Sequence, residues 1–183
     1  MMSKDSGRIL YVVGPSGAGK DTLLRLAAEA LDGSPVLFAH RYITRPTGED
    51  AEAHIPLSRA AFRARRELGL FALDWRSHGL DYGIGIEIDQ WRAQGASVVV
   101  NGSRGDFGRA LARYPDLCPV LITASRETLR QRLVARARED AMEIERRLAR
   151  EIPFDPPGLV TIVNDGPVTE SSRALVRLLT PPA

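Results

Sequence analysis

The sequence feature that most constrains the fold is a run of small residues near the start of the chain. The apolar, β-branched stretch Ile9 to Val13 stops at the loop GPSGAG, residues 14–19, and Lys20 then opens a segment with apolar residues at helical spacing. This order predicts a strand, a tight loop and a helix. Glycines let such a loop wrap closely around an anion, and the N–H groups of the loop and of the helix start point at that anion.

The spacing within this stretch is that of a phosphate-binding loop. Gly14 and Gly19 have four residues between them and are followed by Lys20, which gives the pattern G-x-x-x-x-G-K. A lysine at that place puts a compact positive charge on the outer phosphates of a nucleotide. Of the 25 basic residues only Lys4 and Lys20 are lysines, so a lysine at the motif position is not expected by chance. We therefore expect ATP to lie on residues 14–22. The residues of this predicted site are Gly14, Pro15, Ser16, Gly17, Ala18, Gly19, Lys20, Asp21 and Thr22.

The residue after the lysine indicates where a metal ion would bind. This position normally carries a serine or threonine whose hydroxyl ligates Mg²⁺, but here it is Asp21, followed by Thr22. A carboxylate among phosphates is repulsive unless a cation lies between them, so Asp21 is a candidate Mg²⁺ ligand, either directly or through water. In the alternative, Asp21 only favours the helix N-terminus and Thr22 supplies the hydroxyl. The sequence leaves both readings open.

Length and composition are those of an ordinary globular protein. The chain has 183 residues, of which 44% are hydrophobic and 26% charged, and this predicts one domain over residues 1–183. The net charge of +2 does not argue for a nucleic-acid partner. The first residues lack an apolar signal core, and no apolar run approaches the length of a membrane span. We expect a cytoplasmic protein with no membrane partner, either a monomer or a homodimer.

Strands alternate with helices along the chain. After the first strand and helix, further strands are predicted at residues 35–39, 71–75, 96–100, 117–123 and 159–163. Helices are predicted from Ser58 as N-cap to Glu67, with Phe62 and Leu68 on the apolar side, and at residues 87–94, 107–113, from Ser125 as N-cap onward, 142–152 and 169–179. Residues 40–55 are predicted to be irregular and residues 78–85 are glycine-rich. This alternation favours an α/β fold with a mostly parallel sheet covered on both faces, a three-layer α/β/α arrangement.

Arginines are the candidates for holding a second phosphate group. Phosphoryl transfer requires mainly positioning and positive charge, and a guanidinium grips phosphate through two parallel hydrogen bonds. Arg41, Arg45 and Arg104 are the three candidates, and Arg45 is favoured because Thr44 and Pro46 place it in a loop. We expect these side chains to bind a phosphorylated acceptor.

Polar residues at the end of one predicted strand extend this acceptor site. The strand at residues 96–100 runs into Asn101-Gly102-Ser103-Arg104, and open α/β sheets place ligands at such carboxyl ends. The acidic residue that usually ends this strand is missing. An acceptor that is itself a phosphate needs no general base, because its oxygens are already anionic. His40 and His54 are either ligands or ordinary loop residues.

A second arginine cluster lies between the last two predicted strands. Arg132, Arg136, Arg138 and Arg147 fall on an arm of residues 130–150, where they fit a helical lid that closes over the nucleotide. The alternative for each of them is a solvated surface residue. Arg136 and Arg138 are the two predicted to act on the transferred group.

Several of these segments together resemble the guanylate kinase family. They are GPSGAGK, TRP followed by GE, the W-x-x-H-G-x-x-Y-G stretch from Trp75 to Gly83, the arginine lid and IVND. The resemblance covers nearly the whole chain and implies a P-loop NTPase fold with an acceptor-binding lobe at about residues 40–85 and a lid at about 130–150. It also implies that Asn164 contacts the adenine. The chain departs from the family at the base-binding positions, where it has Thr47-Gly48, His54, Asp74 and Ile84.

A closer resemblance is to the ribose 1,5-bisphosphate phosphokinases of phosphonate breakdown. The shared segments are GKD in the loop, AHRYITR (residues 39–45), HGLDYGIGIEID (78–89) and VNGSR (100–104). This resemblance implies the ATP-dependent conversion of ribose 1,5-bisphosphate, a small sugar phosphate, to 5-phosphoribosyl 1-diphosphate, a precursor of nucleotides and NAD, with ATP and Mg²⁺ as cofactors. The catalytic residues would be Lys20, Arg45, Arg136 and Arg138. The acceptor would be held by Arg41, Arg45, His54, Tyr82, Asn101, Ser103 and Arg104. The alternatives are a nucleoside monophosphate kinase acting on GMP and a non-catalytic scaffold.

Overall fold

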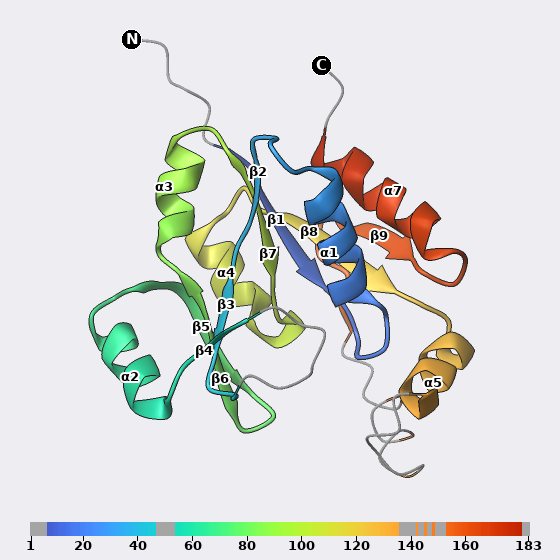
Figure 1. Ribbon diagram of the computed structural model, residues 1–183, viewed down its shortest axis with the longest axis horizontal. Coiled ribbons are helices and arrows are strands. Elements are labelled where there is room, and N and C mark those ends of the chain that lie inside the picture. The colour runs from blue at the N-terminus through green and yellow to red at the C-terminus, as the bar shows by residue number, and fades with distance from the viewer. Residues whose placement is uncertain are drawn as a thin grey trace. The chain divides into compact units, whose positions relative to one another are not determined.

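The computed structural model describes residues 7–46, 54–135, 142, 145, 148 and 153–180 (Figure 1). The strands are β1 (Ile9–Val13), β2 (Val36–Phe38), β3 (Arg41–Ile43), β4 (Ile55–Pro56), β5 (Phe71–Ser77), β6 (Leu80–Gly85), β7 (Ser97–Asn101), β8 (Cys118–Thr123) and β9 (Val160–Val163). The helices are α1 (Lys20–Ala30), α2 (Arg59–Glu67), α3 (Glu87–Ala93), α4 (Phe107–Arg113), α5 (Arg126–Ala135) and α7 (Val168–Leu179), with a short 3₁₀ helix, η1 (Arg104–Asp106).

The strands form two sheets, and the chain divides into two compact units. One sheet has the order β2-β7-β1-β8-β9 and the other β4-β3-β6-β5. The first unit spans residues 1–11 and 33–118, and the second spans residues 12–32 and 119–183. Within the units β2 pairs with β7 and β8 pairs with β9, both in parallel, which confirms the predicted α/β class with its mostly parallel sheet.

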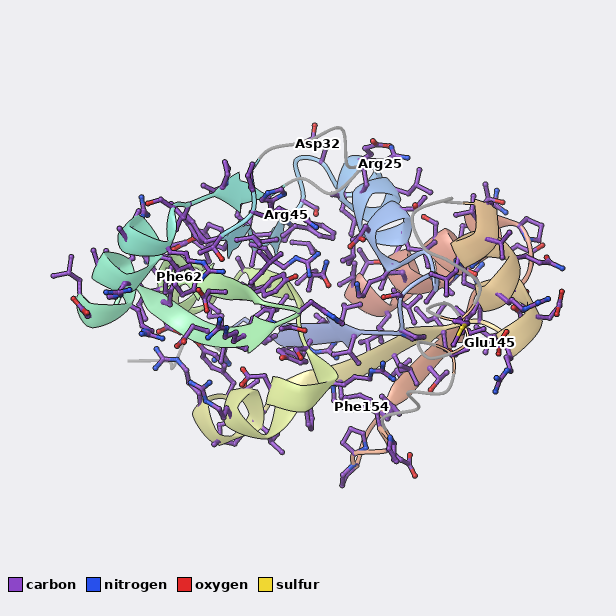
Figure 2. The ribbon with its side chains drawn as sticks, turned by 90° about the horizontal axis from the view of Figure 1, so that it is seen from below. Arg25, Asp32, Arg45, Phe62, Glu145 and Phe154 are labelled. Atoms are coloured by element: carbon purple, nitrogen blue, oxygen red, sulfur yellow. The ribbon has the colours of Figure 1, made fainter. Side chains whose placement is uncertain are left out.

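The first unit contains the four-stranded sheet, and helix α2 packs against one of its faces. In this sheet β3 and β5 each pair with β6 in antiparallel register. As predicted, α2 starts at an N-cap Ser58, whose Oγ accepts the Ala61 N–H at 3.1 Å. Figure 2 shows Phe62 on the sheet side of α2, where it is 3% exposed and its ring lies 4.6 Å from that of Phe71. This aromatic contact anchors the helix to the sheet.

The second unit contains β8, β9 and the helices α1, α5 and α7. Helices α1 and α7 lie side by side in Figure 1, and their apolar residues Leu23, Ala27, Leu175 and Leu179 are buried. As predicted, Ser125 caps α5, because its Oγ accepts the Thr128 N–H at 3.2 Å. No helix in the described part of the chain is long and apolar enough to cross a bilayer.

Two expectations about the first unit were wrong. Part of the stretch predicted to be irregular forms the strands β3 and β4; the glycine-rich stretch, for which no element was predicted, forms β6. These short strands are stabilised by pairing with one another, which no local pattern reveals. Gly83 lies under the Phe71 ring, where an added Cβ would come within 2.6 Å of a ring atom, so this glycine serves packing and not a turn. Leu68 is the C-cap residue of α2 and is 73% exposed, so it does not belong to the apolar side.

Candidate active site

The predicted phosphate-binding loop lies between β1 and the start of α1. Gly17 and Gly19 have φ values of 87° and 84°, in the left-handed region that favours glycine. Gly19 is the N-cap residue of α1, and its carbonyl accepts the Leu23 N–H at 3.0 Å. The first N–H groups of a helix point out of the helix at its N-terminus, so a helix that starts directly after a glycine loop is a favourable place for an anion.

The glycines of the loop are also required by the close packing beneath it. A Cβ added to Gly14 would lie 2.2 Å from the backbone oxygen of Ile122 in β8. A Cβ on Gly19 would lie 2.5 Å from the side-chain nitrogen of Asn164. Any larger residue at either position would push the loop away from the strands of the second unit.

Asn164 and Arg132 bind the backbone of the loop through hydrogen bonds. Asn164 is 2% exposed, and its side-chain amide donates to the Ala18 carbonyl at 2.8 Å. Arg132 of α5 donates to the Asn164 carbonyl at 2.8 Å and lies 3.4 Å from the Gly17 carbonyl. The loop is therefore connected both to the end of β9 and to helix α5, in which the predicted lid begins. The adenine contact of Asn164 stays a prediction.

Lys20 and Asp21 lie together at the first turn of α1. The Lys20 Nζ atom is 3.7 Å from the Asp21 Oδ1 atom, and the two side chains are 14% and 36% exposed. Thr22 is exposed on the same turn. A partly exposed carboxylate next to a hydroxyl suits Mg²⁺, which keeps several waters and takes further oxygens from phosphates. Both candidate metal ligands therefore remain compatible with the structure.

Two of the predicted acceptor residues share one face of the four-stranded sheet. The Cα register pairs Arg41 with Ile84 and pairs Tyr82 with Ile43 and with Trp75. Because side chains alternate along a strand, Arg41 and Tyr82 face the same side, opposite to Tyr42 and the face that α2 covers. The Tyr82 ring is stacked on the Trp75 ring at 5.5 Å and 3°. This stacking fixes Tyr82 at the middle of the sheet.

Arg45 lies in the loop that follows β3, as Figure 2 shows. The preceding Thr44 ties this loop to β6, since its backbone N–H donates to the Asp81 carbonyl at 3.0 Å and its Oγ1 accepts the Asp81 N–H at 2.9 Å. The Nε2 atom of His54 lies 3.3 Å from the Arg45 carbonyl oxygen. The structure therefore brings Arg45 and His54 together, and Thr44 determines where the loop leaves the sheet.

Asn101, Ser103 and Arg104 follow one another at the carboxyl end of β7, as predicted. Asn101 is the last residue of β7 and is 8% exposed, and Arg104 starts η1. Burial lowers the pKa of the Arg104 guanidinium below its ordinary value. A partly desolvated guanidinium interacts more strongly with a phosphate than one in bulk water does.

Part of the predicted site lies outside the described residues. This applies to the lid arginines Arg136, Arg138 and Arg147, and to Thr47-Gly48. In the described part of the arm, Met142, Glu145 and Leu148 are helical, as predicted for residues 142–152. Glu145, labelled in Figure 2, forms ion pairs of 3.2 Å with Arg126 and 3.1 Å with Arg130.

Two curated proteins named "ribose 1,5-bisphosphate phosphokinase PhnN" are similar to nearly the whole chain. The protein from Desulfomicrobium baculatum is 55% identical over 179 residues, which cover 94% of this chain and 94% of that protein. The protein from Chromobacterium violaceum is 52% identical over 179 residues, which cover 97% of this chain and 96% of that protein. The chain belongs to the ribose 1,5-bisphosphate phosphokinase family. No family model matches the chain.

Among solved structures, the fold of this phosphokinase is similar to that of a guanylate kinase. The crystal structure of guanylate kinase from Anaplasma phagocytophilum matches with a TM-score of 0.68 and 20% identity, over 97% of this chain and 87% of that chain. At that identity the likeness establishes the fold alone. Both resemblances predicted from the motifs are thus confirmed.

Proposed function

We propose that this protein transfers the terminal phosphoryl group of ATP to ribose 1,5-bisphosphate and forms 5-phosphoribosyl 1-diphosphate and ADP. The observation that carries this proposal is the identity above 50%, over nearly the full length, to two proteins that bear the name of this phosphokinase. The product is a precursor of nucleotides and NAD, and the reaction fits a place in phosphonate degradation. A cytoplasmic location and a monomeric or homodimeric state belong to the same proposal.

The loop at residues 14–19 would hold the phosphates of ATP. Its backbone N–H groups and the start of α1 neutralise the β- and γ-phosphates, and Lys20 adds the only formal positive charge on this turn of the helix. The 14% exposure of the Lys20 side chain supports this role, because a partly desolvated ammonium interacts strongly with an anion. Asn164 and Arg132 would keep the loop in shape while it binds.

Mg²⁺ would be held by Asp21, Thr22 and the phosphate oxygens. When bound, the ion neutralises charge on the phosphate chain and orients the terminal group. Asp21 is the favoured protein ligand, since its carboxylate is partly exposed and lies at the phosphate end of the helix. Arg136 and Arg138 remain predicted to close over the transferred group.

The acceptor would be held in the first unit by cationic and polar side chains. Arg41, Arg45 and Arg104 suit the two phosphates of the sugar, while Tyr82, His54, Asn101 and Ser103 suit its hydroxyls and remaining phosphate oxygens. An oxygen of the 1-phosphate forms a bond to the γ-phosphorus, and the bond from that phosphorus to the β–γ bridging oxygen breaks. The electron pair leaves with ADP. No general base is needed, because the attacking oxygen is already anionic at neutral pH.

GMP is the competing acceptor that the guanylate kinase fold suggests. An assay that couples ADP release to NADH oxidation should be run with purified protein and equal concentrations of GMP and ribose 1,5-bisphosphate. We expect turnover with the sugar bisphosphate and little with GMP. Strong GMP turnover with none on the sugar would overturn the proposal.

Lys20→Ala tests the nucleotide half of the site. The variant should lose turnover by about 100-fold or more, since it removes a charge that acts on the transferred group, while its thermal unfolding midpoint should stay near that of the wild type. Lys4→Ala is the matched control because Lys4 is the other lysine of the chain. Equal activity of the Lys20 and Lys4 variants would exclude a role of Lys20 in transfer.

A further inference from the structure

A buried tyrosine connects strand β1 to the loop that carries three predicted acceptor residues. Tyr11 is the central residue of β1 and is fully buried. Its hydroxyl donates to the Ser103 carbonyl at 3.0 Å and accepts the Ser103 N–H at 3.0 Å. Every other side chain of this strand is aliphatic. A buried hydroxyl needs partners, and Tyr11 finds both of them on one backbone residue.

The ring of Tyr11 fits the same loop closely. A Cβ added to Gly102 would lie 2.1 Å from the Cζ atom of Tyr11, so only glycine can follow Asn101 beneath this ring. On another side the Phe107 ring lies 5.8 Å away at 58°. The tyrosine therefore fixes the path of the loop through shape as well as through hydrogen bonds.

Ser103, the residue that Tyr11 binds, directly precedes Arg104 in the chain. The Ser103 carbonyl also accepts the Asp106 N–H at 3.2 Å, the bond that forms the turn of η1. A shift of Ser103 would move this turn and the half-buried Arg104 guanidinium with it. Tyr11 thus acts on the acceptor side of the site through Ser103.

We propose that the Tyr11 hydroxyl is a positioning group that sets Ser103 and Arg104 for binding of the phosphorylated sugar. This rests on the proposed function and adds a residue to which neither the motifs nor the resemblance gave a role. Because β1 also leads into the phosphate-binding loop, the separate effects on acceptor and ATP distinguish a local role from a general loss of structure.

Tyr11→Phe removes both hydrogen bonds and keeps the ring. Tyr114→Phe is the matched control: Tyr114 is 4% exposed in the same unit, and its hydroxyl donates to Asp89 at 2.6 Å and accepts from Arg113 at 3.0 Å. In Tyr11→Phe we expect the KM for ribose 1,5-bisphosphate to rise about ten-fold, because the Ser103 N–H and carbonyl lose their buried partner. The KM for ATP should stay within about two-fold of the wild-type value. Tyr114→Phe should lower the unfolding midpoint and leave both KM values unchanged.

Amide hydrogen exchange in the absence of substrate provides a second readout. Tyr11→Phe should speed exchange over residues 101–106, and Tyr114→Phe should not. Should Tyr11→Phe fail to fold, Phe107→Leu leaves the hydroxyl in place and should give a smaller rise of the acceptor KM. An unchanged acceptor KM in a folded Tyr11→Phe protein, or an equal rise in Tyr114→Phe, would overturn the proposal.

These readouts separate the positioning role from the proposed function. If the wild type does not turn over ribose 1,5-bisphosphate, the function and the acceptor half of this proposal both fail. In that case, faster amide exchange over residues 101–106 in Tyr11→Phe would still show that the Tyr11 hydroxyl stabilises the loop. Unchanged exchange together with normal sugar turnover would refute the positioning role alone.

Discussion

Replacing Gly19 by alanine should damage ATP binding out of proportion to the size of a methyl group. Gly19 has a φ of +84°, and its new Cβ would lie 2.5 Å from the side-chain nitrogen of Asn164. A left-handed conformation costs a non-glycine residue about 1–2 kcal/mol. If Asn164 shifts to relieve the clash, its 2.8 Å hydrogen bond to the Ala18 carbonyl is lost, which adds about 1 kcal/mol.

Together these terms amount to about 2–3 kcal/mol, which corresponds to roughly 30- to 150-fold in affinity. The free loop can relax in the variant, and ATP must then restore the strained conformation in order to bind. Isothermal titration calorimetry with ATP and Mg²⁺ measures this directly. From the free-energy cost of about 2 kcal/mol or more, we expect Gly19→Ala to bind ATP at least about 30-fold more weakly than the wild type does.

Gly33→Ala is the control for conformational strain alone. Gly33 has a φ of +77°, but nothing lies within 4 Å of its added Cβ. This variant should lose about 1–2 kcal/mol of unfolding free energy and keep its ATP affinity. Two results would refute the role given to the fit between Gly19 and Asn164. One is a Gly19→Ala variant that binds ATP within about two-fold of the wild type, and the other is an equal loss of ATP affinity in Gly19→Ala and Gly33→Ala.

Two further predictions concern stability. Ser58→Ala should lower the unfolding free energy by about 1 kcal/mol in urea titrations, because the N-cap bond to Ala61 is lost, while Ser58→Asp should keep it; no difference between the two variants would contradict this. Burial raises the pKa of Asp106 above its ordinary 3.8, and its Oδ2 atom has no partner among the described residues. The folded state therefore favours the neutral carboxyl, whose stabilisation is present below pH 3.8 and is lost as the pH rises through the raised pKa. As the pH rises through the raised pKa, the unfolding free energy of Asp106→Asn should therefore increase relative to that of the wild type. A difference in unfolding free energy between the two proteins that stays constant with pH would contradict this.

Elements with strong local patterns could be predicted from the sequence. The strand Ile9–Val13 and the helix opened by Lys20 have their predicted starts, and both serine caps form the expected hydrogen bonds. Strands β3 and β6 were not predicted, because their pairing joins residues about 40 positions apart and local periodicity does not report such contacts. Glycines usually interrupt strands, and Gly83 is tolerated in β6 only because the Phe71 ring fills the space above it.

The sequence named the motif residues of the candidate site but not the residues that support them. The loop glycines and Asn101 to Arg104 could be named because spacing and strand ends mark them, and their roles in binding stay predictions. Tyr11 was missed, although a single polar aromatic residue in a strand that is otherwise aliphatic is a usable signal. Thr44 was read only as a neighbour of Arg45, and its bonds to Asp81 depend on the unpredicted strand pairing. Supporting contacts of this kind become visible only in three dimensions.

The most direct test of the central claim is to follow the γ-phosphate of ATP into the product. ATP labelled with ³²P at the γ-position should be mixed with ribose 1,5-bisphosphate, Mg²⁺ and the protein, the labelled products separated by chromatography and located by their radioactivity, and the product of a parallel unlabelled reaction identified by ³¹P NMR. We predict that the label appears in the terminal phosphate of a diphosphate on C1 of the sugar, with one ADP formed for each. Label found only in inorganic phosphate, or only in GDP when GMP is present, would contradict the proposed reaction.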